Sequence, residues 1–258
     1  MGRLPECVIS QGTVPPSSAN STSFTTLKKG VLAVSSNTTY PPFESIENGR
    51  PVGFDIALIT EIARRLGLTP EITSSPFETI FASLTSHKAD VVISAVTISE
   101  DRKQNVDFTD PYLDADQSLT VRAADATRIR DVDRLGGKVV GVQSGTTGES
   151  CARNALRAKG KVREVRSYQD APPAFDDLLA GRVQGVVNDL PTSRRIVQQK
   201  PGLAIVEILR TDEQYGIAVA KDNPNLREAI NRQLAAIRKD GTYRRIYRQW
   251  LGTEPPSD

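Results

Sequence analysis

The chain has 258 residues, of which 38% are hydrophobic and 25% are charged. These values are ordinary for a globular protein, and the length suits one large domain or two modest ones. Lysine and arginine number 33 against 31 aspartate and glutamate, and a net charge of +2 gives no reason to expect nucleic-acid or membrane-surface binding. No apolar run approaches the roughly 20 residues that a membrane-spanning helix needs.

The first 26 residues read as a tail. Residues 8–26 are rich in Ser, Thr, Pro and Gly, a composition typical of linkers. The start of the chain lacks an apolar signal segment, so we expect that any export signal has been removed. Cys7 and Cys151 are too few for a disulfide framework and show no metal-ligand spacing. A disulfide between them, a lipid anchor at Cys7 and two free thiols all stay open.

From residue 31 the chain alternates between predicted strands and helices. Short apolar runs predict buried strands, and apolar residues at helical spacing predict amphipathic helices. The clearest helix has Ile56, Ile59, Ile62 and Leu66 on one face and ends at Gly67. In this first series the predicted strands are 31–34, 71–73 and 91–93, and the predicted helices are 53–68 and 77–86.

A predicted strand at 117–122 leads out of the first series, and a charged, loop-like stretch at 123–135 follows it. The second series has predicted strands at 138–142, 162–165 and 183–187 and predicted helices at 147–159, 171–179 and 193–199. A strand at 215–220 and helices at 225–239 and 242–251 complete the chain. Strands that alternate with helices favour parallel sheets, so we expect an α/β fold with two lobes.

The segment from Asp90 to Tyr112 reads DVVISAVTISEDRKQNVDFTDPY and contains the strongest functional pattern. A turn of small residues follows the buried strand, and Thr97 and Arg102 come soon after it. Such a segment can collect a free backbone N–H, a hydroxyl and a guanidinium at one strand end. This set suits a carboxylate, because the planar donors of arginine match two carboxylate oxygens. The alternative is a strand, a loop and a surface arginine without a ligand.

The run SAVTISEDRKQNVDFTDPY resembles the signature of the bacterial extracellular solute-binding proteins of family 3, the amino-acid receptors of ABC importers. The family form is a small residue, an apolar residue, Thr or Ser, then Arg, and later a run like F(S/T)DPY. Four further motifs resemble the family's landmarks in the same order: YPPFE at 40–44, GFDI at 53–56, GTTG at 145–148 and DGTY at 240–243. The resemblance covers residues 27–253.

The resemblance implies a type II periplasmic-binding-protein fold of two lobes, each a mostly parallel sheet flanked by helices. Lobe 1 is then 27–112 plus 216–258, lobe 2 is 113–215, and 1–26 is a tail. The chain crosses between the lobes near 112–116 and 211–215, which makes a two-strand hinge. Ligands bind beyond the carboxyl ends of strands in open α/β sheets, so the ligand is expected in a cleft between the lobes that closes around it.

The resemblance also assigns roles to residues of the cleft. Arg102 takes the ligand's carboxylate together with the turn before it and the helix start after Gln143. Asp189 takes the α-ammonium, although an Asp at a strand end is often only a helix N-cap. Tyr40 and Phe77 flank the ligand side chain, with core packing as the alternative for Phe77. The full predicted set is Asn37, Tyr40, Phe77, Ser94, Ala95, Val96, Thr97, Arg102, Gln143, Gly145, Thr146, Thr147, Asn188 and Asp189.

The side-chain end of the expected pocket is neutral. Asn37, Gln143 and Asn188 fall where family members carry specificity groups, and binders of lysine or arginine commonly have an Asp at the position of Asn37. Three amides can donate and accept hydrogen bonds, so glutamine, asparagine or a similar polar amino acid is the first expectation. A basic amino acid is the alternative, and Glu44 is the residue that could supply the missing charge by turning inward.

The resemblance implies a monomer outside the cytoplasm with an ABC permease as partner, no cofactor and no nucleic acid. With His87 as the only histidine, no metal site is expected. One alternative is an enzyme like the cyclohexadienyl dehydratases of this fold. Such enzymes are expected to lose the ammonium-binding Asp, whereas Asp189 is present, and no nucleophile–base pair is evident. The other alternative is a sensor domain cut from a receptor kinase, whose cleft would look the same.

Overall fold

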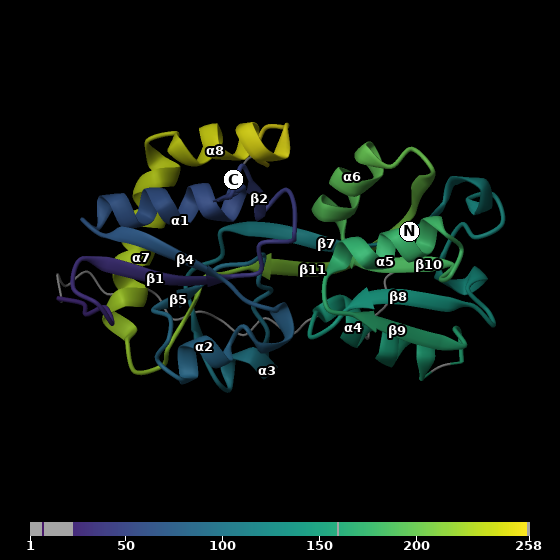
Figure 1. Cartoon of the computed structure of the whole chain (residues 1–258), viewed down its shortest axis with the longest axis horizontal. Helices are drawn as coiled ribbons and strands as arrows, with labels where there is room; N and C mark the ends of the chain where they lie inside the picture. Colours follow the sequence, from purple (N-terminus) through teal and green to yellow (C-terminus); the bar gives the residue numbers. More distant parts are fainter. Residues whose placement is uncertain (1–6, 8–22, 159, 257–258) are drawn as a thin grey trace. The chain divides into compact units, whose positions relative to one another are not determined.

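The structure is a computed structural model that describes Cys7, residues 23–158 and residues 160–256. Its contacts divide the chain into two compact units. Unit 1 contains Cys7, Thr39–Pro41 and the described residues of Asp114–Glu213. Unit 2 contains residues 23–38, Pro42–Leu113 and residues 214–256. Each unit has its own five-stranded sheet with helices around it, which confirms the expected α/β fold class (Figure 1).

The sheet of unit 2 has the strand order β4-β1-β5-β12-β6. The alternating strands of the first series pair in parallel, β1 with both β4 and β5. The last strand to arrive, β12, pairs antiparallel with β5 and β6, so the sheet is mixed. The strands are β1 (Val31–Ser36), β4 (Thr69–Ser74), β5 (Val91–Val92), β6 (Asp107–Phe108) and β12 (Ala218–Val219).

Three long helices of unit 2 pack together, and in Figure 1 two of them, α1 and α8, lie on the opposite side of this sheet from α2 and α3. They are α1 (Phe54–Arg65), α7 (Pro224–Lys239) and α8 (Thr242–Leu251). The predicted apolar face of α1 is buried, with Ile59 and Ile62 fully inaccessible to solvent. The chain leaves α1 through Gly67, whose φ of 73° is in the left-handed region that glycine adopts readily.

The prediction of one continuous helix over 77–86 is wrong. This stretch forms two short pieces, η2 (Phe77–Thr79) and α2 (Ala82–Thr85). The amides of Ile80 and Leu84 bond to carbonyls three residues back, as in a 3₁₀ turn. The Ser83 hydroxyl also donates to the Ile80 carbonyl, a side-chain bond that competes with regular helix. Ile80 and Leu84 are nevertheless buried as expected.

Unit 2 also contains a β-hairpin that we did not predict, β2 (Ser45–Glu47) paired antiparallel with β3 (Arg50–Val52). Asn48 and Gly49 between the strands have φ values of 50° and 75°. Such values suit the tight turn that an Asn-Gly pair favours. The remaining helix of this unit is α3 (Glu100–Lys103).

The sheet of unit 1 has the strand order β11-β7-β10-β8-β9 and is also mixed. β8 is parallel to β9 and β10, whereas β10 is antiparallel to β7. Two boundaries between the units fall within β7 and β11, and two others lie on either side of Thr39–Pro41. The strands are β7 (Leu113–Arg122), β8 (Val139–Gln143), β9 (Glu164–Tyr168), β10 (Gly185–Asp189) and β11 (Leu203–Tyr215), of which β11 was predicted only at its end, as the start of the strand at 215–220.

The helices of unit 1 cover a core of buried aliphatic residues from β7, β8 and β10, including Leu119, Val140 and Val187. The predicted helix at 147–159 begins as α4 (Thr147–Cys151) and continues as a π-helical turn at Ala152–Arg157. The others are α5 (Ala171–Leu179) and α6 (Leu190–Gln199), with single 3₁₀ turns η3 (Ala123–Asp125) and η4 (Val132–Arg134).

The two cysteines form a disulfide, which was one of the three states left open by the sequence. Cys7 bonds to Cys151 at the end of α4 across a sequence separation of 144. Both cysteines are buried and pack with Ala155. The disulfide therefore attaches Cys7 to α4 of unit 1.

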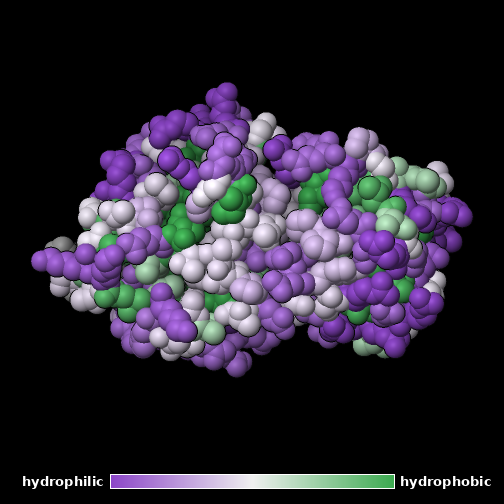
Figure 2. All heavy atoms as spheres, viewed as in Figure 1, coloured by the Kyte–Doolittle hydropathy of each residue, from purple (hydrophilic) through white to green (hydrophobic). Residues whose placement is uncertain are grey.

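The surface drawn in Figure 2 is mainly hydrophilic, and its apolar residues are scattered over the face in view. Among the described residues the exposed large hydrophobic side chains are Leu27, Ile46 and Leu179. No helix of the described part of the chain is both long and apolar enough to cross a membrane.

Candidate functional site

Arg102 is held in a defined orientation in unit 2. Ser99 caps α3 and accepts a hydrogen bond from the Arg102 amide. The Nη1 atom of Arg102 donates to the Thr97 carbonyl at 2.7 Å. The guanidinium carbon lies 5.4 Å from the ring centroids of both Phe77 and Phe81, a cation–π distance. Two predicted site residues, Phe77 and Thr97, therefore fix the position of a third.

The Ser94–Ala95 turn is tied to buried acidic residues. Ala95 has a φ of 47°, in the left-handed region that residues other than glycine rarely adopt. Its N–H donates to Oδ2 of Asp55 at 2.6 Å, so the free N–H that we expected at this turn is not that of Ala95. The Ser94 hydroxyl donates to Oε1 of Glu44 at 2.7 Å.

The neighbours of this turn also have backbone partners. The carbonyl of Val96 accepts from Gly216, and Thr97 forms an isolated bridge with Tyr215. The Asn37 amide donates to the Ser94 hydroxyl at 3.0 Å, which connects the end of β1 to the turn. In unit 2 the structure thus brings together Asn37, Ser94, Ala95, Val96, Thr97 and Arg102.

Glu44 contacts the Ser94–Ala95 turn through its carboxyl. It is fully buried and hydrogen-bonded to Ser94, and its carboxyl also lies against that of Asp55. The Asn37 side chain donates instead to the Ser75 carbonyl at 3.3 Å. These contacts weigh against Glu44 as the missing charge of a basic-ligand pocket.

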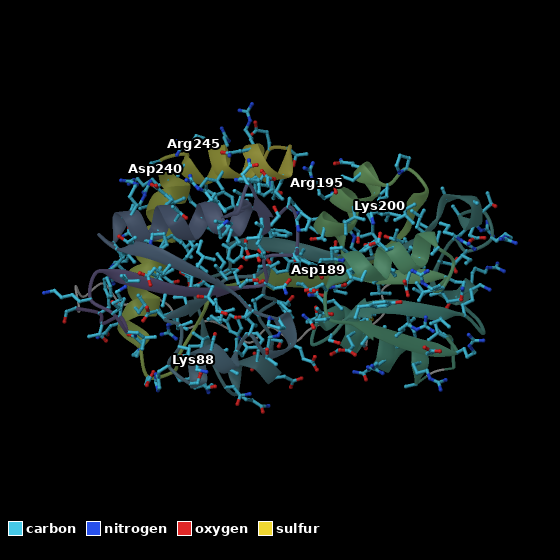
Figure 3. All side chains as sticks on the ribbon, viewed as in Figure 1. Lys88, Asp189, Arg195, Lys200, Asp240 and Arg245 are labelled. Carbon is cyan, nitrogen blue, oxygen red and sulfur yellow. A yellow bond between two sulfur atoms is a disulfide. The ribbon has the colours of Figure 1, made fainter. Side chains whose placement is uncertain are left out.

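In unit 1, Asp189 ends β10 and stands at the N-cap position of α6, but among the described contacts its side chain makes no capping hydrogen bond. It is only 7% exposed, and its Oδ1 accepts a hydrogen bond from Gln117. Figure 3 labels Asp189, the residue before α6, with Arg195 of that helix and Lys200, the residue that follows it. The helix-cap alternative therefore does not account for this carboxylate.

A second buried carboxylate, Glu213, completes a polar cluster around Gln117. Gln117 Nε2 also donates to Glu213 Oε1 at 3.0 Å, and the Thr147 hydroxyl donates to Glu213 Oε2 at 2.8 Å. Gln117 and Glu213 were missed by the sequence reasoning. They lie in β7 and β11, where Gln117 stands between Asp116 and Ser118 and Glu213 between Asp212 and Gln214, so no local pattern distinguishes them.

Tyr40 groups with unit 1 and contacts the same region. Its hydroxyl donates to Oδ1 of Asn188 at 3.0 Å. Burial, and next the negative charge of Asp189, raise the pKa of the Tyr40 hydroxyl well above its usual value. The hydroxyl therefore stays protonated and acts as a neutral donor at physiological pH.

Several polar groups of the loop between β8 and α4 form hydrogen bonds within the loop and the first turn of α4. The Thr146 hydroxyl donates to the Gln143 carbonyl and accepts from the Glu149 amide, as a helix N-cap does. The Gly145 amide donates to the Glu149 carboxylate at 2.8 Å. The Gln143 side chain donates to the Gln169 carbonyl at 3.3 Å. Thr147 is the member of this loop that reaches the cluster of Asp189 and Glu213.

The arrangement offers a fixed guanidinium in unit 2 and buried carboxylates with amides in unit 1. No group of three or more His, Cys, Asp or Glu side chains within the described ranges could hold a metal ion. Taken unit by unit, a guanidinium suits a carboxylate, and buried carboxylates with amides suit an ammonium or another polar donor.

Comparison with known proteins agrees with this chemistry. The chain is 37% identical over 219 residues to the ABC transporter arginine-binding protein 1 of Escherichia coli K12, covering 83% of this chain and 87% of that protein. It is 31% identical over 229 residues to the L-cystine-binding protein TcyJ of the same organism, with 88% and 85% covered. A solved structure of an ancestral arginine-binding protein bound to glutamine matches with a TM-score of 0.82 and 41% identity, covering 88% of this chain and 100% of that one.

This solved structure and other solved structures of arginine-binding proteins that match the chain confirm the type II periplasmic-binding-protein fold. A family model matches residues 32–253. The chain belongs to the bacterial extracellular solute-binding proteins, family 3.

Proposed function

We propose that this protein is the extracytoplasmic receptor of an ABC importer and that it binds a polar L-amino acid. Membership of the family supports the receptor role, and the relatives named above bind arginine or cystine. The main observation in favour of an amino-acid ligand is the guanidinium of Arg102, which is oriented by Thr97 and by two aromatic rings. A carboxylate is the natural partner of a guanidinium held in this way.

The α-ammonium of the ligand binds Asp189 in this proposal. Asp189 is nearly buried, and Glu213 lies across Gln117 from it. A ligand that lacks the ammonium would not make the charge-assisted hydrogen bond to Asp189 and would lose its contribution to the affinity. A keto acid or a plain carboxylic acid should therefore bind poorly.

Glutamine or asparagine is the first candidate for the ligand. Asn37, Gln143 and Asn188 provide neutral donors and acceptors, and the ancestral arginine-binding protein has been solved with glutamine bound. Arginine is the second candidate, because a relative 37% identical to this chain is named for it. A thermal-shift screen of the proteinogenic amino acids tests both, since a ligand that binds only the folded state raises the melting temperature.

A ligand that uses Arg102 of one unit and Asp189 of the other favours whichever state allows both contacts. We propose that binding closes the hinge around the ligand. Small-angle scattering should then show a smaller radius of gyration with saturating ligand than without. An unchanged radius would contradict closure but would leave amino-acid binding in place.

The dehydratase alternative predicts aromatic product from prephenate or arogenate. The receptor proposal predicts none, and an absorbance assay with either substrate separates the two. The sensor-domain alternative shares the ligand and differs only in what the binding unit is attached to, so the sequence of the full-length gene decides it.

A further inference from the structure

Besides Asp189 and Glu213, the chain has a second acidic pair, Glu44 and Asp55 of unit 2, which contacts the Ser94–Ala95 turn. Both residues are fully buried. Their segments approach closely, because the amides of Phe54 and Asp55 donate to the carbonyls of Pro42 and Phe43 at 3.0 Å. The side chains of Glu44 and Asp55 then meet within hydrogen-bonding distance.

Two carboxyl groups can hydrogen-bond to each other only if one of them carries a proton, because an ionised carboxylate has acceptors and no donor. Asp55 Oδ2 already accepts from the Ala95 amide and from the Tyr112 hydroxyl at 2.8 Å. Asp55 Oδ1 is also buried, and no N–H or O–H group of the described residues donates a hydrogen bond to it. A proton between the two carboxyl groups satisfies this oxygen.

The electrostatic surroundings favour the protonated pair. Burial raises the pKa of Asp55 to about 7, although the hydrogen bonds from Ala95, Tyr112 and Glu44 act in the opposite direction. The Tyr112 hydroxyl donates to Asp55, and burial keeps Tyr112 protonated by raising its pKa. The Tyr243 hydroxyl in turn donates to the Tyr112 carbonyl. Beyond them, the guanidinium carbon of Arg238 lies 5.1 Å from the centroid of the Tyr243 ring.

The pair holds both residues of the turn. Glu44 accepts from the Ser94 hydroxyl, and Asp55 accepts from the Ala95 amide. Ala95 has a left-handed φ of 47°, a conformation that persists only where surrounding contacts enforce it. The Ser94 hydroxyl in turn accepts from the Asn37 amide, so the same contacts extend to the end of β1.

We propose that Glu44 and Asp55 share a single proton and act together as positioning residues for the Ser94–Ala95 turn, so that loss of this proton weakens amino-acid binding. The effect on affinity rests on the proposed function. When the proton leaves, two like charges face each other in a buried site, and their repulsion moves the acceptors that hold Ser94 and Ala95.

The direction of the pH dependence follows from the raised pKa. The folded state keeps this proton at pH values where an ordinary aspartate has lost it. The stabilising contribution of the pair is therefore complete below about pH 4, where the unfolded chain is also protonated, and is lost as the pH rises through about 7. Affinity should decline over the upper part of this range.

Glu44→Gln is the decisive variant. The glutamine amide donates to Asp55 in place of the shared proton, and its carbonyl still accepts from Ser94. Asp55→Asn is the second variant, because its amide can donate to Glu44 while its carbonyl accepts from Ala95 and Tyr112. The matched control is Glu47→Gln, which changes an exposed glutamate of the same unit.

Two measurements decide the proposal. The first is the ¹H–¹⁵N resonance of the Ala95 amide in the ligand-free protein, from pH 5.5 to 8.5. We expect it to titrate near pH 7 in the wild type and in Glu47→Gln, and to stay constant in Glu44→Gln or Asp55→Asn. The second is calorimetric affinity for L-glutamine and L-arginine over the same range. We expect a loss of about tenfold in the wild type, the size of a one-unit interaction between coupled sites, and a flat profile in the variants.

The outcomes separate the two proposals. If neither amino acid binds the wild type at any pH, the ligand proposal fails, and the Ala95 resonance still decides whether the proton is shared. A wild-type Ala95 resonance that does not titrate overturns the shared proton. Equal affinity profiles in the wild type and both variants overturn the positioning role, even where the resonance titrates.

Discussion

The hydroxyl of Tyr40 donates a 3.0 Å hydrogen bond to Oδ1 of Asn188, a residue 148 positions away in the chain. Both side chains are buried, and both were expected to contact a ligand. In this structure they bind each other. A ligand that donates to Asn188 Oδ1 therefore shares or replaces the bond from Tyr40, whereas a ligand that accepts from Nδ2 leaves it in place.

A double-mutant cycle measures this bond. Tyr40→Phe keeps the ring but leaves Asn188 without the hydroxyl, and should lower the free energy of unfolding by about 1–2 kcal/mol. Asn188→Ala and the double variant complete the cycle. We expect a coupling of about 1 kcal/mol between the two positions in denaturant unfolding. Additive effects would show that the bond contributes nothing to stability.

Arg102→Ala should weaken amino-acid binding by about 2–5 kcal/mol, because the ligand carboxylate loses its charged partner. Arg102→Lys should restore only part of the affinity, since an ammonium is a point charge and stacks less well between Phe77 and Phe81. The control is Lys103→Ala on the same helix, which removes a surface pair with Glu100. Wild-type affinity of Arg102→Ala in calorimetry would refute the carboxylate role.

The ligand preference depends on the charge at Asn37. A buried guanidinium or ammonium at the end of the ligand would lack a carboxylate partner there, which is costly. We therefore expect glutamine or asparagine to outcompete arginine and lysine, and Asn37→Asp to narrow or reverse that order. Competition binding measures both. A wild-type preference for arginine of tenfold or more, about 1.4 kcal/mol, would reject the neutral ligand.

Gly53 is required where the loop 42–43 meets the start of α1. Its φ is 136°, and a Cβ there would lie 2.0 Å from the Phe43 carbonyl oxygen. Gly53→Ala should lower the free energy of unfolding by at least about 3 kcal/mol, because strain and a backbone clash combine. Gly67→Ala is the control: with a φ of 73° and open space around it, it should cost only about 1–2 kcal/mol. Equal melting temperatures for the two variants would contradict this account.

The disulfide should contribute measurably to stability. Cys7 and Cys151 are 144 residues apart, so the bond restricts the unfolded chain strongly. Removing it with Cys7→Ser/Cys151→Ser should cost about 2–5 kcal/mol. Reductant should lower the melting temperature of the wild type to that of the double variant and leave the variant unchanged. A wild type insensitive to reductant under unfolding conditions would argue that the bond is absent in solution.

Local pattern was sufficient for much of the fold. The helices predicted at 171–179 and 242–251 have those bounds in the structure, and the apolar face predicted for the first helix is the buried face of α1. These features depend on residues within one or two turns of each other, which the sequence displays directly. The motif around Arg102 is local as well, so Thr97 and Arg102 could be predicted to act together.

Only the tertiary structure decided the partners of the buried polar groups. Gln117 meets Asp189 and Glu213 because β7, β10 and β11 belong to the same sheet, and their residues are 72 and 96 positions from Gln117. Glu44 and Asp55 interact with each other next to the Ser94–Ala95 turn, which starts 50 residues after Glu44. Tyr40 and Asn188, and the two cysteines of the disulfide, are likewise partners that lie far apart in the sequence. A buried polar group must find a partner, but which partner it finds depends on the path of the backbone, and that path is the sum of many contacts distant in sequence.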